Sequence, residues 1–167
     1  MIEASSISSI ILSYMLIWGL IGCVLFFALV VVIFRTGVVY TARKQDGTLK
    51  DEIPLRGKFA LLIIPISLTL FLLLANKISL VHNDLTMSLW QIFTLNYGLY
   101  LILFFFDTFF IDGYTLAIWR PGFLKIPNEM GRGSMRKHIL ASLPVGLLLG
   151  ILLTIIPSTT TYLLWMK

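Results

Sequence analysis

The chain has 167 residues, of which 58% are hydrophobic and 13% are charged, and its mean hydropathy is +0.94. A soluble globular chain is about 25% charged and about 45–50% apolar, so this composition excludes an ordinary soluble domain and indicates a membrane protein. The net charge of +5 is not gathered on a basic soluble face, which argues against nucleic-acid binding. We predict a single membrane domain over residues 1–167.

The first apolar segment covers residues 7–34, with no charged residue between Glu3 and Arg35. A membrane span needs about 20 mostly apolar residues, so this segment is long enough to cross. Its start, MIEASSISS, is acidic, whereas a cleavable signal peptide begins with basic residues and has a shorter apolar core. We therefore expect it to remain as a helix. Cys23, the only cysteine, excludes an intrachain disulfide and a CxxC redox site.

Three further spans are predicted at residues 59–81, 88–119 and 139–165. The third span lies within residues 85–119, which as one helix is about 52 Å long and exceeds a hydrocarbon core of about 30 Å. Either this helix tilts or projects from the bilayer, or it breaks near Gly113. The predicted fold is therefore all-α, with four transmembrane helices.

Polar residues recur along one face of the third span. At about 100° per residue, Asn96, Tyr100, Asp107 and Tyr114 fall within about 40° of one another. Asp112 lies about 140° from Asp107, so a straight α-helix does not bring the two carboxylates to one site. This spacing argues against a paired-carboxylate site for a metal or for acid–base catalysis.

An intramembrane carboxylate costs about 2.5–3.5 kcal/mol, so it marks a functional or a partnered site. In the functional interpretation, the stripe lines a polar path and Asp107 binds a cation or a proton. In the structural one, the stripe makes interhelical hydrogen bonds with Ser67 or Thr69 of the second span, or with a partner protein. For Asp112 we expect pairing with side chains at the cytoplasmic helix ends, which are Arg35, Lys58, Arg120 and His138.

Basic residues set the predicted orientation, because Lys and Arg near the spans are retained on the cytoplasmic side. Of the 13 Lys and Arg residues, six lie in residues 35–58 and five in residues 120–138. These two loops are therefore predicted to be cytoplasmic, with both termini on the outer side. The same charges predict contact with anionic lipid headgroups.

Small residues recur every four positions in the fourth span, at Ser142, Gly146, Gly150 and Thr154. Such a ridge lets another helix approach closely. The sequence leaves open whether that helix belongs to the same subunit or to a partner.

The segment before the fourth span offers an anion site. Glycines, basic side chains and a helix N-terminus together can bind a phosphate group, here that of a lipid. We expect Ser134 to cap the fourth helix. The candidate headgroup-binding residues are Arg132, Gly133, Ser134, Arg136 and Lys137.

Cofactor chemistry finds little support in the sequence. His82 and His138 fall at opposite ends of their spans, which argues against a bis-histidine haem within one subunit. The chain also carries no Walker-type or dinucleotide-binding fingerprint. We predict no metal and no cofactor.

The stretch FDTFFIDGYTLAIWRPGFLKIPNEMG, residues 106–131, resembles a pattern in small four-helix bacterial membrane proteins of unassigned function. In that pattern, paired acidic positions near the end of the third span precede an aromatic residue, a Pro-x-Phe and an Ile-Pro. The matching residues here are Asp107, Asp112, Trp119, Pro121, Phe123, Ile126 and Pro127. The resemblance implies a bacterial origin and brings no activity with it.

Three functions are compatible with these patterns. The first is a non-enzymatic membrane protein that acts through helix–helix association, as an accessory subunit or a homo-oligomer, and it predicts that the Gly146/Gly150 ridge matters most. The second is a small oligomeric transporter or channel that depends on Asp107. The third is an enzyme acting on a lipid at the inner leaflet with Asp112, Arg120 and His138, for which no nucleophile–base–orienter set can be assembled. We favour the first.

Overall fold

The computed structural model describes residues 4–38, 50–81, 85–124, 126 and 132–166. These residues are helical apart from short connections, and four helices are long and apolar enough to cross a membrane. They are Ile11–Arg35, Leu55–Leu80, Leu89–Trp119 and Ile139–Trp165. The prediction of an all-α fold with four membrane-length helices is confirmed.

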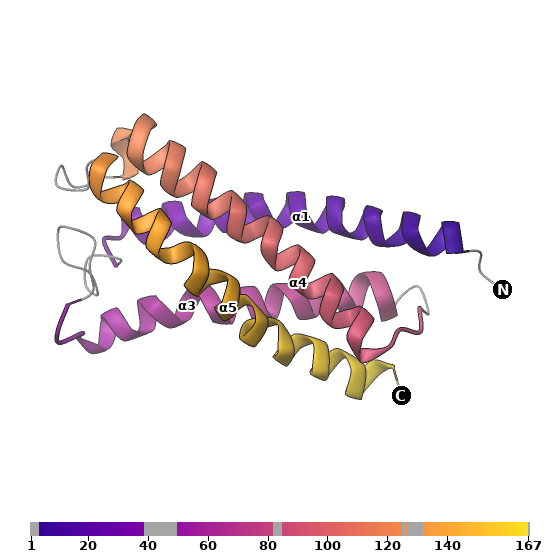
Figure 1. The fold of residues 1–167 in the computed structure, drawn as a ribbon. Coiled ribbons are helices and arrows are strands. Elements are labelled where there is room, and N and C mark those ends of the chain that lie inside the picture. Colours follow the sequence, from indigo (N-terminus) through magenta and orange to yellow (C-terminus); the bar gives the residue numbers. More distant parts are fainter. Residues whose placement is uncertain (1–3, 39–49, 82–84, 125, 127–131, 167) are drawn as a thin grey trace.

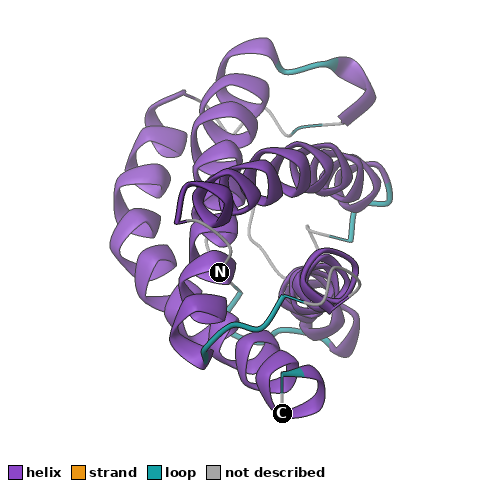
Figure 2. Ribbon diagram, turned by 90° about the vertical axis from the view of Figure 1, so that its right-hand side faces the viewer, coloured by secondary structure: helices purple, strands orange, loops and turns teal. Residues whose placement is uncertain are grey.

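The elements follow one another in a simple up-and-down order. They are α1 (Ala4–Arg35), α3 (Leu55–Asn76), the π-helix η1 (Lys77–Val81), α4 (Leu89–Phe105), the π-helix η2 (Phe106–Trp119), the 3₁₀ turn η3 (Gly122–Leu124) and α5 (Arg132–Trp165). Figure 1 shows that both chain ends lie at the same end of the bundle, as an even number of crossings requires. Figure 2 views the bundle from that end.

The helices α3 and α5 each begin a few residues before the predicted membrane span. α3 begins at Leu55, directly after Pro54, because the fixed backbone angle and missing N–H of proline suit a helix start. α5 begins at Arg132, so Ser134 lies inside the helix and does not cap it. The first residues of both helices therefore lie within the predicted loops 35–58 and 120–138.

The start of α4 agrees closely with the prediction. Gln91 N–H donates to Ser88 Oγ at 3.3 Å, and Ser88 N–H donates to Gln91 Oε1 at 2.8 Å. This reciprocal pair is a capping box, which satisfies two backbone donors that a helix start otherwise leaves unpaired. The helix therefore begins at Leu89, one residue after the predicted start of the third span.

The third span does not break at Gly113. From Phe106 to Trp119 the helix continues as η2, in which backbone hydrogen bonds join residues five apart instead of four. η2 ends at Arg120, which has a positive φ of 48° and donates its N–H to Thr115 O at 2.8 Å. Pro121 then prevents the helix from continuing, because it has no N–H to donate.

α4 is the central helix of the bundle. It packs on α5 and on α1, whereas α3 packs mainly on α5 and touches α1 only briefly. Figure 1 shows α4 and α5 crossing over α1 and α3. Leu72 of α3 and Ile92 and Leu99 of α4 are completely buried in the core between these helices. The bundle is thus tight around α4 and loose between α1 and α3.

Candidate functional site

The contact between α4 and α5 is built on the predicted small-residue ridge. A Cβ added at Gly150 would lie 2.7 Å from Tyr100 Cζ, and one added at Gly146 would lie 3.1 Å from Phe104 Cδ2, with other ring atoms closer still. The aromatic rings of α4 therefore lie directly over the two glycines. The sequence leaves open whether the ridge contacts a helix of the same subunit or of a partner. In the structure the ridge packs against α4 of the same subunit.

The two outer members of the ridge bond within their own helix. Thr154 is buried, and its hydroxyl donates to Gly150 O at 2.8 Å. Ser142 is half-buried, and its hydroxyl donates to Ile139 O at 3.0 Å. Their hydroxyls are thus satisfied without a partner helix, so small size is what these residues contribute to the contact.

Polar side chains of α4 also donate hydrogen bonds to α5. The bonds run from Asn96 Nδ2 to Ser158 Oγ at 2.8 Å, from Tyr97 OH to Leu147 O at 3.3 Å and from Tyr100 OH to Gly146 O at 2.7 Å. Asn96 and Ser158 are fully buried. Each interhelical bond of this kind contributes about 0.6 kcal/mol on average, so this row stabilises the helix pair and fixes its register.

A second polar group joins three helices near the end of the bundle where the termini lie. Tyr14 OH of α1 donates to Asn76 Oδ1 of α3 at 2.9 Å, and Asn76 Nδ2 donates to Thr161 Oγ1 of α5 at 2.8 Å. Close by in sequence, Trp18 Nε1 donates to Ser79 Oγ at 2.6 Å. Because Asn76 is fully buried and uses both ends of its amide, it connects α1 to α5 through α3.

The structure shows hydrogen bonds from Asn96 and Tyr100 of the stripe to α5, and not to Ser67 or Thr69 of α3. Thr69 Oγ1 donates to Pro65 O of its own helix at 2.9 Å, whereas the partner of Asn96 is Ser158 on α5. The hydrogen-bonded residues that the sequence patterns did not indicate are Tyr14, Trp18, Asn76, Ser79, Ser158 and Thr161. Most of them are single polar residues in otherwise apolar runs. Polar side chains in such runs tend to hydrogen-bond across helices, and this is the sequence feature that indicates them.

One buried amide is only half satisfied. Among the described side chains, Asn96 Oδ1 is a buried polar atom with no hydrogen-bond partner. Asn96 Nδ2 donates a hydrogen bond to Ser158 Oγ. The Ser158 hydroxyl donates its own proton to Thr154 O at 2.6 Å, so it has no proton left for Asn96 Oδ1. Asn96 therefore contributes less to stability than Asn76, although both side chains are equally buried.

The predicted stripe of Asn96, Tyr100, Asp107 and Tyr114 is not one continuous face. Asn96 and Tyr100 are buried against α5 and Asp107 is half-buried, but Tyr114 is 47% exposed. The cause is the backbone, because a rotation of about 100° per residue holds for α4 and not for the more widely wound η2. Asp107 nevertheless lies within electrostatic range of Tyr100.

The π-helical backbone also changes how the two aspartates relate. In an α-helix, Asp107 and Asp112 point about 140° apart. In η2 the backbone hydrogen bonds join residues five apart, so the two residues occupy equivalent positions on successive turns. The expected divergence of the two carboxylates holds for a straight α-helix, whereas the segment that carries them is a π-helix. Both side chains are half-buried.

Aromatic rings form one row along α4 and a second row along η2, and we call the two rows together the aromatic spine. In α4 it contains Trp90, Phe93, Tyr97, Tyr100 and Phe104, with ring centroids 5.4–6.2 Å apart. In η2 it contains Phe106, Phe110, Tyr114 and Trp119, with centroids 4.9–6.4 Å apart. Successive rings are three or four residues apart in α4 and four or five residues apart in η2. This change in spacing matches the change from an α-helix to a π-helix, and it is visible in the sequence.

The residues predicted to pair with Asp112 or to bind headgroups lie at the other end of the bundle from the termini. Arg35 ends α1, Lys58 lies in the first turn of α3, and Arg120 follows η2. Outside the described residues lie the side chains of His138, Arg132, Ser134, Arg136 and Lys137, and the surroundings of Gly133. Ion pairing of Asp112 and headgroup binding at the start of α5 stay predictions.

Within the described ranges, no three His, Cys, Asp or Glu side chains come together in a way that could hold a metal ion. No protein-family model, curated protein sequence or solved structure matches this chain. The function must therefore be inferred from the chain's own residues.

Proposed function

We propose that this chain is a non-enzymatic multi-pass protein of the bacterial cytoplasmic membrane that acts through helix–helix association, as an accessory subunit or a homo-oligomer. The supporting observation is the use of its polar side chains. Asn76, Asn96 and Tyr100 are buried and hydrogen-bonded to other helices of the same subunit. Such bonds hold the helices in one arrangement and leave an apolar outer surface for contact with neighbours.

The outward face of α5 is the surface we assign to association. Val145, Leu148, Leu152 and Ile155 are all exposed, with Leu148 at 67%, and they recur at spacings of three and four residues. Branched apolar side chains with this period interdigitate with those of a neighbouring helix. This face takes the role first expected for Gly146 and Gly150, which are covered by α4.

The test is the native mass and composition of the protein after gentle extraction from its own membrane. We expect a complex with a second copy or with a different polypeptide. The paired substitutions Leu148→Ala and Leu152→Ala should reduce it to the monomer, whereas Leu70→Ala and Leu74→Ala, on the exposed side of α3, should leave it intact. A monomeric wild-type protein, or equal masses for both variants, would refute the proposal.

A second function, an oligomeric transporter or channel, is favoured by the position of Asp107. A half-buried carboxylate is costly at membrane depth, and such residues mark ion and proton pathways. Flux of protons and alkali cations into proteoliposomes would test it. Asp107→Asn should abolish flux with the native mass unchanged; unchanged flux in Asp107→Asn would exclude this function.

The orientation belongs to the same proposal. With the loops that join α1 to α3 and η3 to α5 in the cytoplasm, their basic residues meet the anionic inner leaflet and both termini lie outside. Cysteines placed at residue 5 and at residue 51 in a Cys23→Ala chain should differ in labelling. A membrane-impermeant thiol reagent applied to intact cells should label only the first, and the reverse pattern would overturn the orientation.

A further inference from the structure

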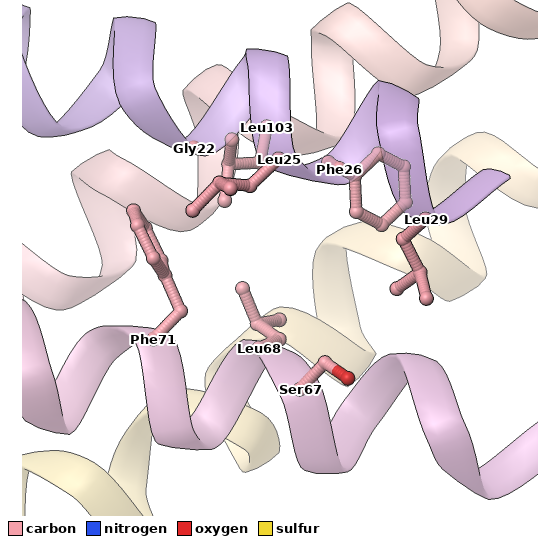
Figure 3. Close-up of a pocket in the computed structure, with 8 residues that line it drawn as sticks. All are labelled: Gly22, Leu25, Phe26, Leu29, Ser67, Leu68, Phe71 and Leu103. Atoms are coloured by element: carbon pink, nitrogen blue, oxygen red, sulfur yellow. The ribbon is translucent and has the colours of Figure 1, made fainter. Parts of the chain in front are cut away.

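A cavity of about 220 Å³ lies between the middle parts of α1 and α3 and is closed on one side by Leu103 of α4. We call it the crevice. Figure 3 shows side chains of α1, among them Leu25 and Leu29, and side chains of α3, among them Phe71, around the same space. Ser67 supplies the one side-chain polar group among the lining residues.

The crevice opens sideways, out of the bundle. Leu25 lines it and is still 55% exposed, and the neighbouring Ile66 and Leu70 on α3 are exposed as well. All three lie in the middle of helices long enough to span a membrane. The medium at the mouth of the crevice is therefore the hydrocarbon of the bilayer.

Water is a poor occupant for this space. A buried water needs two to four polar partners, and the crevice offers the single hydroxyl of Ser67. Apolar cavities of about 150 Å³ in soluble proteins stay dry and bind molecules such as benzene. A larger apolar space that is open to lipid is therefore suited to a segment of acyl chain.

The charges at one end of the crevice indicate which lipid supplies the chain. Leu29 precedes Arg35 by six residues and Gly22 precedes it by 13, which places them about 9 Å and about 20 Å from it along α1. Half of the hydrocarbon core is about 15 Å, so the crevice runs from within the leaflet nearest Arg35 to just past the middle of the bilayer. Arg35 at the end of α1 and Lys58 in the first turn of α3 are both exposed.

We propose that the crevice binds one acyl chain of an anionic phospholipid whose phosphate group lies at Arg35 and Lys58. Hydrocarbon fills the apolar walls, and the two cations select a negative headgroup at the end of the same helices. This site is separate from the outward face of α5, so it stands whether or not the chain associates with a partner.

The test counts phospholipid that stays bound to the purified protein. Three proteins are compared: the wild type, Ser67→Leu and the control Ala141→Leu. Each is reconstituted in vesicles of equal parts phosphatidylglycerol and phosphatidylcholine and then gently extracted. Native mass spectrometry measures the mass of the protein with its bound lipid. Wild type and Ala141→Leu, whose new side chain lies on exposed α5, should retain phosphatidylglycerol. Ser67→Leu fills the crevice and should retain about tenfold less, whereas equal retention would overturn the proposal.

Two further variants separate the parts of the proposal. Arg35→Gln with Lys58→Gln should still retain phospholipid but lose the preference for phosphatidylglycerol; an unchanged preference would overturn the assignment of the headgroup. Ser67→Cys in a Cys23→Ala chain is oxidised in the native membrane. A disulfide to another polypeptide would show that protein and not lipid occupies the crevice, and it would overturn the proposal, whereas an uncrosslinked monomer supports it.

Discussion

The closest contact between α4 and α5 gives the sharpest prediction, for Gly150→Ala. The new Cβ would lie 2.7 Å from Tyr100 Cζ and closer to two other atoms of that ring. Tyr100 has little room to move, because its hydroxyl donates to Gly146 O at 2.7 Å and its ring stacks on Tyr97 and Phe104. The substitution must therefore push the two helices apart or displace the ring.

The size of the effect follows from three contributions. Overpacking a close contact costs about 1–3 kcal/mol. Displacing the ring also loses the Tyr100–Gly146 hydrogen bond, which contributes about 0.6 kcal/mol. Alanine is a better helix former than glycine by about 1 kcal/mol, which offsets part of the loss. We expect Gly150→Ala to lower the free energy of unfolding by about 2 kcal/mol.

The assay is unfolding in mixed micelles with increasing SDS, followed by the loss of helical circular dichroism. Gly122→Ala is the matched control, because its Cβ would meet no atom within 4 Å, and it should change stability by less than about 0.5 kcal/mol. If Tyr100 is the obstacle, Tyr100→Ala should make the Gly150→Ala substitution nearly neutral. Equal stability of wild type, Gly150→Ala and Gly122→Ala would refute the reasoning.

Two further predictions concern the polar side chains. Asn76→Leu should lower the free energy of unfolding by about 2 kcal/mol in the same assay, because Tyr14 OH and Thr161 Oγ1 lose their hydrogen-bond partner. Asn96→Leu removes one hydrogen bond and a half-satisfied amide, so it should lower the free energy of unfolding by less than about 1 kcal/mol. Equal effects of the two substitutions would contradict this prediction. In a Cys23→Ala chain, Asp107→Cys with Asp112→Cys should be bridged by dibromobimane, a short thiol crosslinker, because residues five apart are neighbours in η2. Asp107→Cys with Phe110→Cys should not be bridged, and the opposite pattern would show an α-helix.

The four spans could be read from the sequence because hydrophobicity and length are local properties. A run of apolar residues long enough to cross a bilayer predicts a helix whatever it packs against, so the segments 7–34, 59–81, 88–119 and 139–165 agree with the observed helices. The Ser142-to-Thr154 ridge was visible for the same reason, since its four-residue spacing is a property of one helix.

Only the tertiary structure decided which surfaces meet. Nothing local to α5 shows that the rings of Tyr100 and Phe104 cover its glycines, or that Ser158 and not Ser67 is the partner of Asn96. The π-helical turn was the other limit, because small changes in rotation per residue accumulate along η2 and separate Tyr114 from the stripe. Partner choice and accumulated rotation depend on helices far apart in the chain, and the three-dimensional packing alone fixes them.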